Sequence, residues 1–475
     1  MITGKAENGL MYAVRKSGSS VGYCALSIRC GTRDEAGFHS GIAHFTEHTI
    51  FKGTGHRSAA VINSCLDRYG GELNAYTTKE EIVFHATVLK EDLSKAASLL
   101  FELATEATFP EKEIATEKGV VIDEIQSYKD SPADDVYDRF EEALFAGHPL
   151  GGSILGTPAS VRKITSEELR RFVKENFTPD RMAFTVVADF DERRMEKALL
   201  KLVSRHFPSG SVATSPAGVS PQGSSATSPV PGSTERSKAG TSETAVTGTS
   251  SENSATLGLE GGPQAERSGG VCEADVFRER SPRSGIPEVP RNHFDKTVDK
   301  KNHEVNVVIG GLAPSLYESK DRITAVLLAN ILGGPASNSI LNGILREKNG
   351  WVYGVECGYT QYRDSGIMAI SLGCDKENLD KCFNAVRKAV SGLQEKPLSD
   401  RRLKAAKKQL VCQLAISSES GESQCLSMGK SLLAYGRVAT DEENKTAIES
   451  VTSSDIQEMA RRVFDEDNLS RLIFL

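Results

Sequence analysis

The two halves of the chain repeat the same series of local patterns, and this repetition is the strongest constraint on its fold. In each half, an apolar run typical of a strand leads through a short charged turn into an amphipathic helical pattern. About 85 residues further on, a second helical pattern precedes a closing strand. These landmarks occupy residues 82–88, 93–103, 166–176 and 183–187 in the first half, and 367–372, 379–393, 453–463 and 471–475 in the second. Their matching order and spacing predict an internal duplication.

A segment of low complexity separates the two halves. Residues 209–270 are rich in Ser, Gly, Thr and Pro, contain no aromatic residue and show no hydrophobic period. Such a composition cannot bury enough apolar surface to offset the entropy of ordering the backbone. We therefore predict an N-terminal domain over residues 1–208, a flexible linker over 209–290 and a homologous C-terminal domain over 291–475.

Each half is predicted to be an α+β domain, with a mostly antiparallel sheet and helices packed on one face. The strands of the first domain are expected to begin as a hairpin. Residues 11–14 form its first predicted strand, and residues 21–28 form its second.

Charge and cysteine content exclude several classes of protein. The net charge of −7 and the pI of about 5.9 argue against broad electrostatic binding to nucleic acid or anionic lipid. No window approaches 18 apolar residues, so no membrane span is predicted. The nine cysteines are scattered, never spaced as C-x-x-C, and typical of reduced thiols. Since the first ten residues carry no export signal, we expect a cytoplasmic protein without nucleic-acid or membrane partners.

Residues 44–48 form an H-x-x-E-H pentad inside a segment that can be helical. On a helix, His44 and His48 project from one face and can bind the same metal ion. A zinc ion held by two histidines needs a third protein ligand and keeps one position for water. Glu47 is placed to take a proton from that water. Alone, the pentad also fits two unrelated histidines on a helix, so a third ligand would sharpen the interpretation.

The pentad is the inverted zincin signature, and through it the chain resembles the pitrilysin-type (M16) metallopeptidases, in particular small bacterial members and the mitochondrial processing peptidase β subunit. The resemblance implies a zinc cofactor and a third ligand, Glu124, which lies 76 residues beyond His48. It also implies a helper glutamate two helical turns earlier, Glu117. Residues 117–125 have the apolar spacing of a buried helix, in which two unpaired carboxylates would be costly.

Further segments match the family, so the resemblance covers nearly all of the chain outside the predicted linker. They are residues 31–35, 51–54, 70–77, 149–151 and 154–156. By resemblance, Asn74 and Ala75 hold the backbone of an extended peptide at a sheet edge, a mode that tolerates many sequences. The alternative is that residues 70–73 make only a tight turn with an apolar anchor.

The second half has no H-x-x-E-H, so it is not expected to bind zinc in the same way. By resemblance, Arg346 and Tyr353 reach the substrate near the metal, and Tyr353 stabilises the oxyanion of the reaction. Asp134 and Asp138 match acidic positions that contact a basic substrate residue. A solvated arginine, a packed tyrosine and a solvated acidic helix face are the structural alternatives.

The sequence thus predicts a zinc endopeptidase acting on peptides or unfolded polypeptide enclosed in a clamp between two homologous domains. Zinc is held by His44, His48 and Glu124, Glu47 is the base, and Glu117 supports the ligand glutamate or shuttles a proton. The resemblance implies a homodimer. The alternative is a non-catalytic subunit, or one that is active only beside a different partner subunit.

Overall fold

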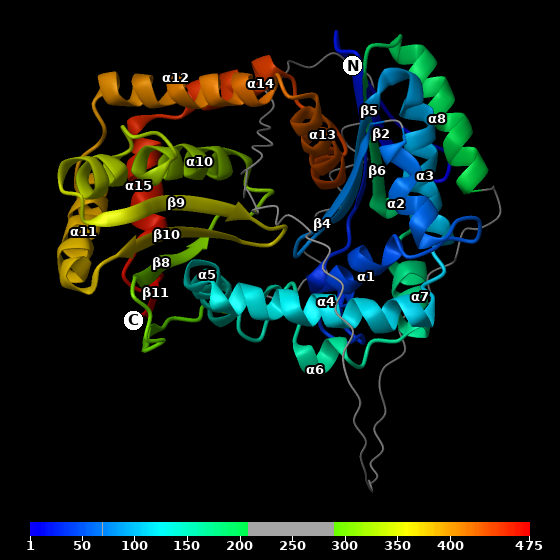
Figure 1. Cartoon of the computed structure of the whole chain (residues 1–475). Coiled ribbons are helices and arrows are strands. Elements are labelled where there is room, and N and C mark those ends of the chain that lie inside the picture. The colour runs from blue at the N-terminus through cyan, green and yellow to red at the C-terminus, as the bar shows by residue number, and fades with distance from the viewer. Residues whose placement is uncertain (69, 208–288) are drawn as a thin grey trace, which may run out of the picture.

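The computed structural model describes residues 1–68, 70–207 and 289–475, so the predicted linker lies almost entirely outside the described residues. Two sheets lie side by side, each with its own set of helices (Figure 1). The first sheet has the order β1-β2-β6-β3-β5-β4. Its strands are β1 (Ile2–Lys5), β2 (Met11–Lys16), β3 (Val21–Ile28), β4 (Glu72–Thr77), β5 (Ile82–Leu89) and β6 (Met182–Ala188). The second sheet has the order β7-β11-β8-β10-β9, with β7 (Asp295–Val298), β8 (Val305–Ala313), β9 (Val352–Gln361), β10 (Gly366–Cys374) and β11 (Ser470–Phe474).

The helices follow the same order in both halves. The first half contains η1 (Thr32–Asp34), α1 (Ile42–Ile50), α2 (Ala59–Asp67), η2 (Lys90–Asp92), α3 (Leu93–Glu106), α4 (Glu111–Asp130), α5 (Pro132–Leu144), η3 (Pro149–Gly151), α6 (Pro158–Val161), α7 (Ser166–Asn176), η4 (Pro179–Arg181) and α8 (Glu192–His206). The second contains α10 (Ser319–Gly333), η5 (Asn342–Lys348), η6 (Lys376–Asn378), α11 (Leu379–Glu395), α12 (Asp400–Ser417), α13 (Gly421–Tyr435), α14 (Asp441–Ser450) and α15 (Ser453–Val463).

The two sheets match strand by strand once β1 is set aside, which confirms that the halves are homologous α+β domains. The parallel pair β2–β6 of the first sheet corresponds to the parallel pair β7–β11 of the second. Strand β3 of the first half corresponds to β8 of the second, and the closing strand β6 corresponds to β11. The helices and strands from β3 to β6 follow the same order as those from β8 to β11. By this order α1 corresponds to α10, α4 to α12 and α5 to α13.

The predicted hairpin of residues 11–14 and 21–28 is wrong. Strand β6 lies between β2 and β3, parallel to the first and antiparallel to the second. All seven residues of β6 are buried, so this strand suits the centre of a sheet covered on both faces. A local pattern cannot show that a strand from much later in the chain separates two strands that are neighbours in sequence.

Each sheet carries its own helices on one face, and the opposite face is covered by a helix from the other half. Met428 and Leu432 of α13 pack against Ala25 and Ala183 on the first sheet. Phe140 of α5 packs against the second sheet. Figure 1 shows α4 and α5 running from the first half toward the second, and α13 standing beside the first sheet. This reciprocal exchange joins the two halves through buried apolar contacts.

In the described parts of the chain, no helix combines the length and apolar composition needed to cross a membrane.

Candidate metal centre

Helices α1 and α4 pack against each other and bring the pentad to the two predicted glutamates. Ile42, Phe45 and Ile50 of α1 are fully buried in the core of the first half. On α4, Val121 and Ile125 are buried in the same core. Anchoring the apolar residues in this way leaves His44, His48 and Glu124 to meet where the two helices touch.

Three potential ligand atoms converge at this contact. Glu124 Oε2 lies 3.6 Å from His44 Nε2 and 3.3 Å from His48 Nε2. Tetrahedral zinc with bonds near 2.1 Å would place its ligand atoms about 3.4 Å apart. Glu124 Oε2 is shielded from solvent and faces both histidine nitrogens, an arrangement that suits a shared cation. Among the residues that the structure describes, His44, His48 and Glu124 are the one group of His, Cys, Asp or Glu side chains placed so that it could hold a metal ion.

The two histidines have different electrostatic surroundings. Burial lowers the pKa of His44 to about 4, and nearby His48 acts in the same direction. Burial also lowers the pKa of His48, but hydrogen bonds to Glu117 and Glu124 outweigh it and raise that pKa to about 9. Near neutral pH, protonated His48 therefore balances the charge of Glu124, and it has to release its proton before Nε2 can bind a metal ion.

Glu117 lies behind His48 and does not join the ligand group. Its Oε1 is 3.1 Å from His48 Nδ1, and its Oε2 is 2.7 Å from the ammonium of Lys52. A carboxylate on the second nitrogen of a metal-binding histidine fixes the ring and its tautomer, leaving Nε2 for the metal. Glu117 is predicted to support Glu124 or to shuttle a proton, but its contacts are with His48 and Lys52, so those two roles stay predictions.

Glu47 lies beside the cluster and is tied to the edge of the first sheet. The hydroxyl of Thr77 in β4 donates a 2.5 Å hydrogen bond to Glu47 Oε2. Burial raises the pKa of Glu47, and this hydrogen bond acts against the rise. A carboxylate with a raised pKa is suited to accepting a proton near neutral pH.

Strand β4, which contains the predicted substrate-binding residues, is an edge strand. Among the strands that the structure describes, it pairs with β5 alone, and its other edge has no neighbour there. Asn74 is exposed and Ala75 is half-buried. Since β4 also contacts α1, a peptide added to this edge would pass close to Glu47.

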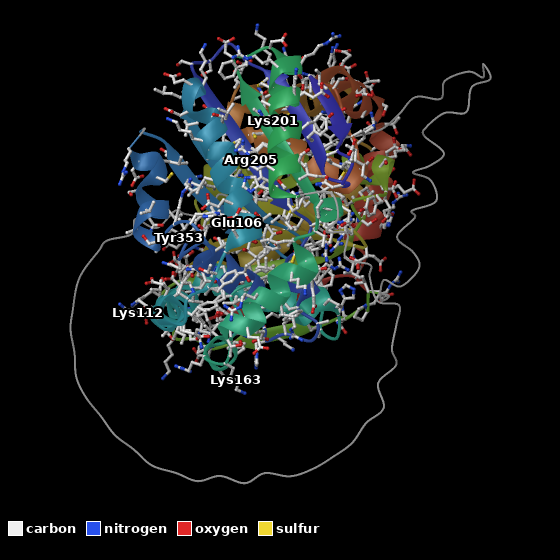
Figure 2. The ribbon with its side chains drawn as sticks, turned by 90° about the vertical axis from the view of Figure 1, so that its right-hand side faces the viewer. Glu106, Lys112, Lys163, Lys201, Arg205 and Tyr353 are labelled. Carbon is white, nitrogen blue, oxygen red and sulfur yellow. The ribbon has the colours of Figure 1, made fainter. Side chains whose placement is uncertain are left out.

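The remaining predicted residues are not in contact with the cluster. Tyr353, labelled in Figure 2, is 62% exposed and donates a 2.8 Å hydrogen bond to Asp375 Oδ1. Arg346 is exposed at the end of η5. On α5, Asp134 accepts a hydrogen bond from Ser131 at the helix start, whereas Asp138 is partly buried. The structure therefore leaves the roles of these four residues as predictions.

The second half has amide side chains at the place that corresponds to the cluster. Asn330 of α10 donates a 2.7 Å hydrogen bond to Gln413 Oε1 of α12. Gln409 of α12 donates to Asn330 Oδ1 at 3.5 Å. Neutral amides bonded to one another satisfy this helix contact without a cation. The absence of an H-x-x-E-H from the second half thus has a structural counterpart.

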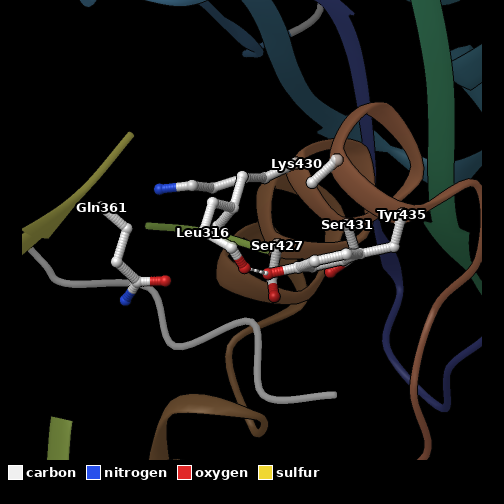
Figure 3. Close-up of a pocket in the computed structure, with 7 residues that line it drawn as sticks. Leu316, Gln361, Ser427, Lys430, Ser431 and Tyr435 are labelled. Carbon is white, nitrogen blue, oxygen red and sulfur yellow. Dashed lines mark hydrogen bonds between the residues drawn. The ribbon is translucent and has the colours of Figure 1, made fainter. Parts of the chain in front are cut away.

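The small pocket shown in Figure 3 lies apart from the cluster, between α13 and the second sheet. Its lining residues are Leu316, Gln361, Ser427, Lys430, Ser431, Ala434 and Tyr435. The Tyr435 hydroxyl donates a 3.2 Å hydrogen bond to the Leu316 carbonyl across it. None of the cluster residues lines this pocket, so it does not compete with the metal centre as the candidate site.

Sequence reasoning did not assign Lys52 and Thr77, although both lie in segments that match the family. Lys52 follows the pentad, and Thr77 ends the segment that contains Asn74. The only available signal was their position in those segments, because neither residue type predicts an interaction with a carboxylate from elsewhere in the chain.

Comparison with known proteins identifies the family. A sequence profile described as Insulinase (Peptidase family M16) matches residues 11–158. A second profile, described as Peptidase M16 inactive domain, matches residues 163–410. The chain belongs to the M16 peptidase family.

The matches to relatives and to solved structures cover nearly the whole chain. An "uncharacterized zinc protease YmxG" of Bacillus subtilis is 28% identical over 447 residues, covering 94% of this chain and 91% of the relative. An "uncharacterized zinc protease" of Streptomyces coelicolor is 25% identical over 434 residues, covering 91% and 80%. The crystal structure of a protease from Helicobacter pylori has a TM-score of 0.78 at 18% identity, covering 100% of this chain and 98% of that one. At this identity the last match supports the fold alone.

Proposed function

We propose that the chain is a zinc-dependent endopeptidase whose metal is held by His44, His48 and Glu124. The observation that carries this proposal is the convergence of three ligand atoms, His44 Nε2, His48 Nε2 and Glu124 Oε2, with Glu47 beside them. Relatives of similar length are named zinc proteases, which supports the choice of metal.

In the proposed mechanism, the residues of the chain hold the metal and move the proton. Bound zinc polarises the peptide carbonyl and makes a water molecule more acidic. Glu47 accepts the proton of this water and delivers it to the leaving amine, while Thr77 keeps one of its oxygens in place. Glu117 holds the ring of His48 through Nδ1.

The proposed substrate is an extended peptide or an unfolded segment enclosed between the two halves. It adds to β4 along Asn74 and Ala75, so that main-chain hydrogen bonds select for extended backbone. Arg346 and Tyr353 are proposed to contact the substrate from the second half. The exposed hydroxyl of Tyr353, held by Asp375, is compatible with this role.

Acidic residues on α5 are proposed to favour a basic residue near the cleaved bond. Asp138 supports this better than Asp134, because the latter already accepts the hydrogen bond of Ser131. Among the described residues, Asp138 makes no hydrogen bond or ion pair. Its carboxylate can therefore pair with a Lys or Arg of the substrate.

We also propose that the active form is a homodimer. The alternative is a chain that cuts peptides only beside a different partner subunit, or not at all. Gel filtration of the purified chain, with peptidase activity measured across the peak, tests this directly. A homodimer that is active by itself excludes the obligate partner.

The main experiment is cleavage of unstructured peptides rich in basic residues by the purified chain. Wild type is compared with Glu47→Gln, with Asp123→Asn as the matched control and with a zinc chelator. Asp123 is an exposed carboxylate beside Glu124, so its loss should leave cleavage unchanged. We expect Glu47→Gln and the chelator to abolish cleavage. A chain that retains zinc but cuts none of a broad peptide set would overturn the stand-alone enzyme.

A further inference from the structure

The helix that carries both histidines begins without a capping side chain of its own. Its N-cap residue, Gly41, has a left-handed backbone with φ of 87° and no side chain to accept a hydrogen bond. The first backbone N–H groups of a helix have no partner within the helix and need another acceptor. Something else must therefore satisfy the start of α1.

The carboxylate of Glu35 accepts from two backbone N–H groups at this start, those of the N-cap and of the second helical residue. Gly41 N–H donates to Glu35 Oε2 at 2.9 Å, and Ala43 N–H donates to Glu35 Oε1 at 3.0 Å. A carboxylate with both oxygens engaged fixes the position of the helix end in two directions. His44 is the next residue after Ala43, so this contact lies directly beside a proposed metal ligand.

The same helix start is held by a second close contact. A Cβ on Gly41 would lie 2.7 Å from the Leu155 carbonyl, and a Cβ on Gly156 would lie 2.4 Å from the Ser40 carbonyl. The Ser160 hydroxyl also donates to the Ser40 carbonyl at 2.7 Å. These approaches leave the loop before α1 little room to move.

Glu35 is itself attached to rigid parts of the first half. Asp34, its neighbour, accepts a 2.8 Å hydrogen bond from Arg181 and another from the backbone N–H of Gly31. Residues 31–35 thus connect the end of β3 to the start of α1 through these hydrogen bonds.

We propose that Glu35 is a positioning residue for the metal centre, setting where α1 begins so that His44 and His48 meet Glu124. The inference rests on the proposed function, since it needs the three residues to bind zinc. A ligand set of this kind has to be held to within about 0.5 Å of its productive geometry. A cap beside the first ligand is well placed to supply that precision.

The test measures metal binding in the full chain rather than peptide cleavage. Burial raises the pKa of Glu35 to about 8, so measurements are made at pH 8.5, where the wild-type carboxyl is mostly ionised. Zinc affinity is measured by chelator competition, and the geometry of the site is read from the visible absorption spectrum of the Co²⁺-loaded chain. Glu35→Gln keeps the size of the side chain but can accept only one of the two backbone N–H groups.

The matched control is Asp191→Ala, which removes the cap of another helix. Asp191 caps α8 by accepting from the Arg194 N–H at 3.0 Å, far from the cluster in sequence. If zinc affinity fell only because the chain was less stable, both variants would show the loss. If Glu35 positions α1, only Glu35→Gln shows it. If Glu35→Gln does not fold, Glu35→Asp, which keeps the charge but shortens the reach, takes its place.

We expect Glu35→Gln to weaken zinc binding by about 10–100-fold and to shift the Co²⁺ spectrum. Asp191→Ala should change zinc binding by less than about twofold. Unchanged zinc affinity and spectrum in a folded Glu35→Gln chain would overturn the positioning role alone. A wild-type chain that binds no zinc would overturn the proposed function as well, so the two failures are distinguishable.

Discussion

His48 lies between two carboxylates, one for each ring nitrogen. Glu124 faces Nε2 and Glu117 faces Nδ1, while Lys52 pairs with the far oxygen of Glu117. Glu117 is buried, and its pKa is lowered because the hydrogen bonds from His48 and Lys52 outweigh the effect of burial. It is therefore an anion held in one orientation, which is the property that a support for a metal-binding histidine needs.

Replacing this support should weaken metal binding without removing a ligand. We predict that Glu117→Gln lowers zinc affinity by about 10–100-fold, because His48 loses the charged acceptor that fixes its ring. Competition with a chelator of known affinity measures the change. Asp123→Asn, an exposed carboxylate on the same helix, is the control and should bind zinc like wild type. Equal affinities in both variants would show that Glu117 has no such role.

Asp138 provides a prediction about pH. Burial, with help from Glu141, Glu142 and Asp134, raises the pKa of Asp138 to about 6, and Lys79 acts in the opposite direction. The carboxyl is thus neutral below that pH and negatively charged above it.

The preference for peptides with a basic residue should therefore increase as the pH rises from 5 to 7. The measured quantity is the ratio of kcat/KM for two peptides that differ by Arg against Gln near the cleaved bond. In Asp138→Asn this ratio should stay low and flat across the same range. A ratio that rises equally in the variant would assign the preference to other groups.

At the scale of elements, the two halves exchange equivalent helices. Helix α5 leaves the first half to cover the second sheet, and α13, its counterpart, covers the first sheet. The Thr185 hydroxyl of β6 also donates a 2.8 Å hydrogen bond to the Cys425 carbonyl of α13. Each sheet is buried on its second face only because the other half is present.

Shortening a buried side chain of the exchanged helix α13 should therefore destabilise the whole chain. Leu432 of α13 is 1% exposed and packs on the first sheet, so Leu432→Ala is predicted to lower the free energy of unfolding by about 2–5 kcal/mol. Ile416→Ala, at a position that is 73% exposed on α12, should change it by less than about 0.5 kcal/mol. Urea unfolding of the two variants decides the matter. Similar small losses in both would mean that α13 contributes little to holding the sheet.

At the scale of the whole molecule, a group of ion pairs joins the halves near the end of β4. Arg33 Nη2 lies 2.5 Å from Asp364 Oδ2, and Arg33 also pairs with Glu80. Arg363 Nε lies 3.0 Å from Glu80 Oε1. The side chains of Arg33 and Asp364 are only 7% and 9% exposed, so losing one partner leaves the other charge poorly solvated.

We predict that Asp364→Ala destabilises the chain by about 3–5 kcal/mol, since it leaves Arg33 in a buried place with one fewer carboxylate. Asp295→Ala removes the carboxylate of another arginine pair, but Asp295 is 55% exposed there, and the loss should be about 0–1 kcal/mol. Thermal or urea unfolding compares the two. If Asp364→Ala were no worse than Asp295→Ala, the ion pairs between the halves would be dispensable for stability.

Much of the local structure and the metal centre could be predicted from the sequence. The helices over residues 166–176 and 453–463 have the predicted limits, and the duplication appears as two matching sheets. His44, His48 and Glu124 meet because a spacing of four residues puts two side chains on one helix face, while family resemblance supplied the third residue. These features depend on local periodicity and on motif spacing, which the sequence carries directly.

Other features were decided by tertiary structure alone. The insertion of β6 between β2 and β3, the exchange of α5 and α13, and the contacts of Lys52 and Thr77 all join segments that are distant in sequence. Several orders of strands satisfy the same alternation of apolar residues. Any nearby carboxylate can accept the hydrogen bonds from the N–H groups at the start of a helix. The choice among them follows from which arrangement buries both faces of each sheet and pairs its buried charges, and only the folded chain makes that choice.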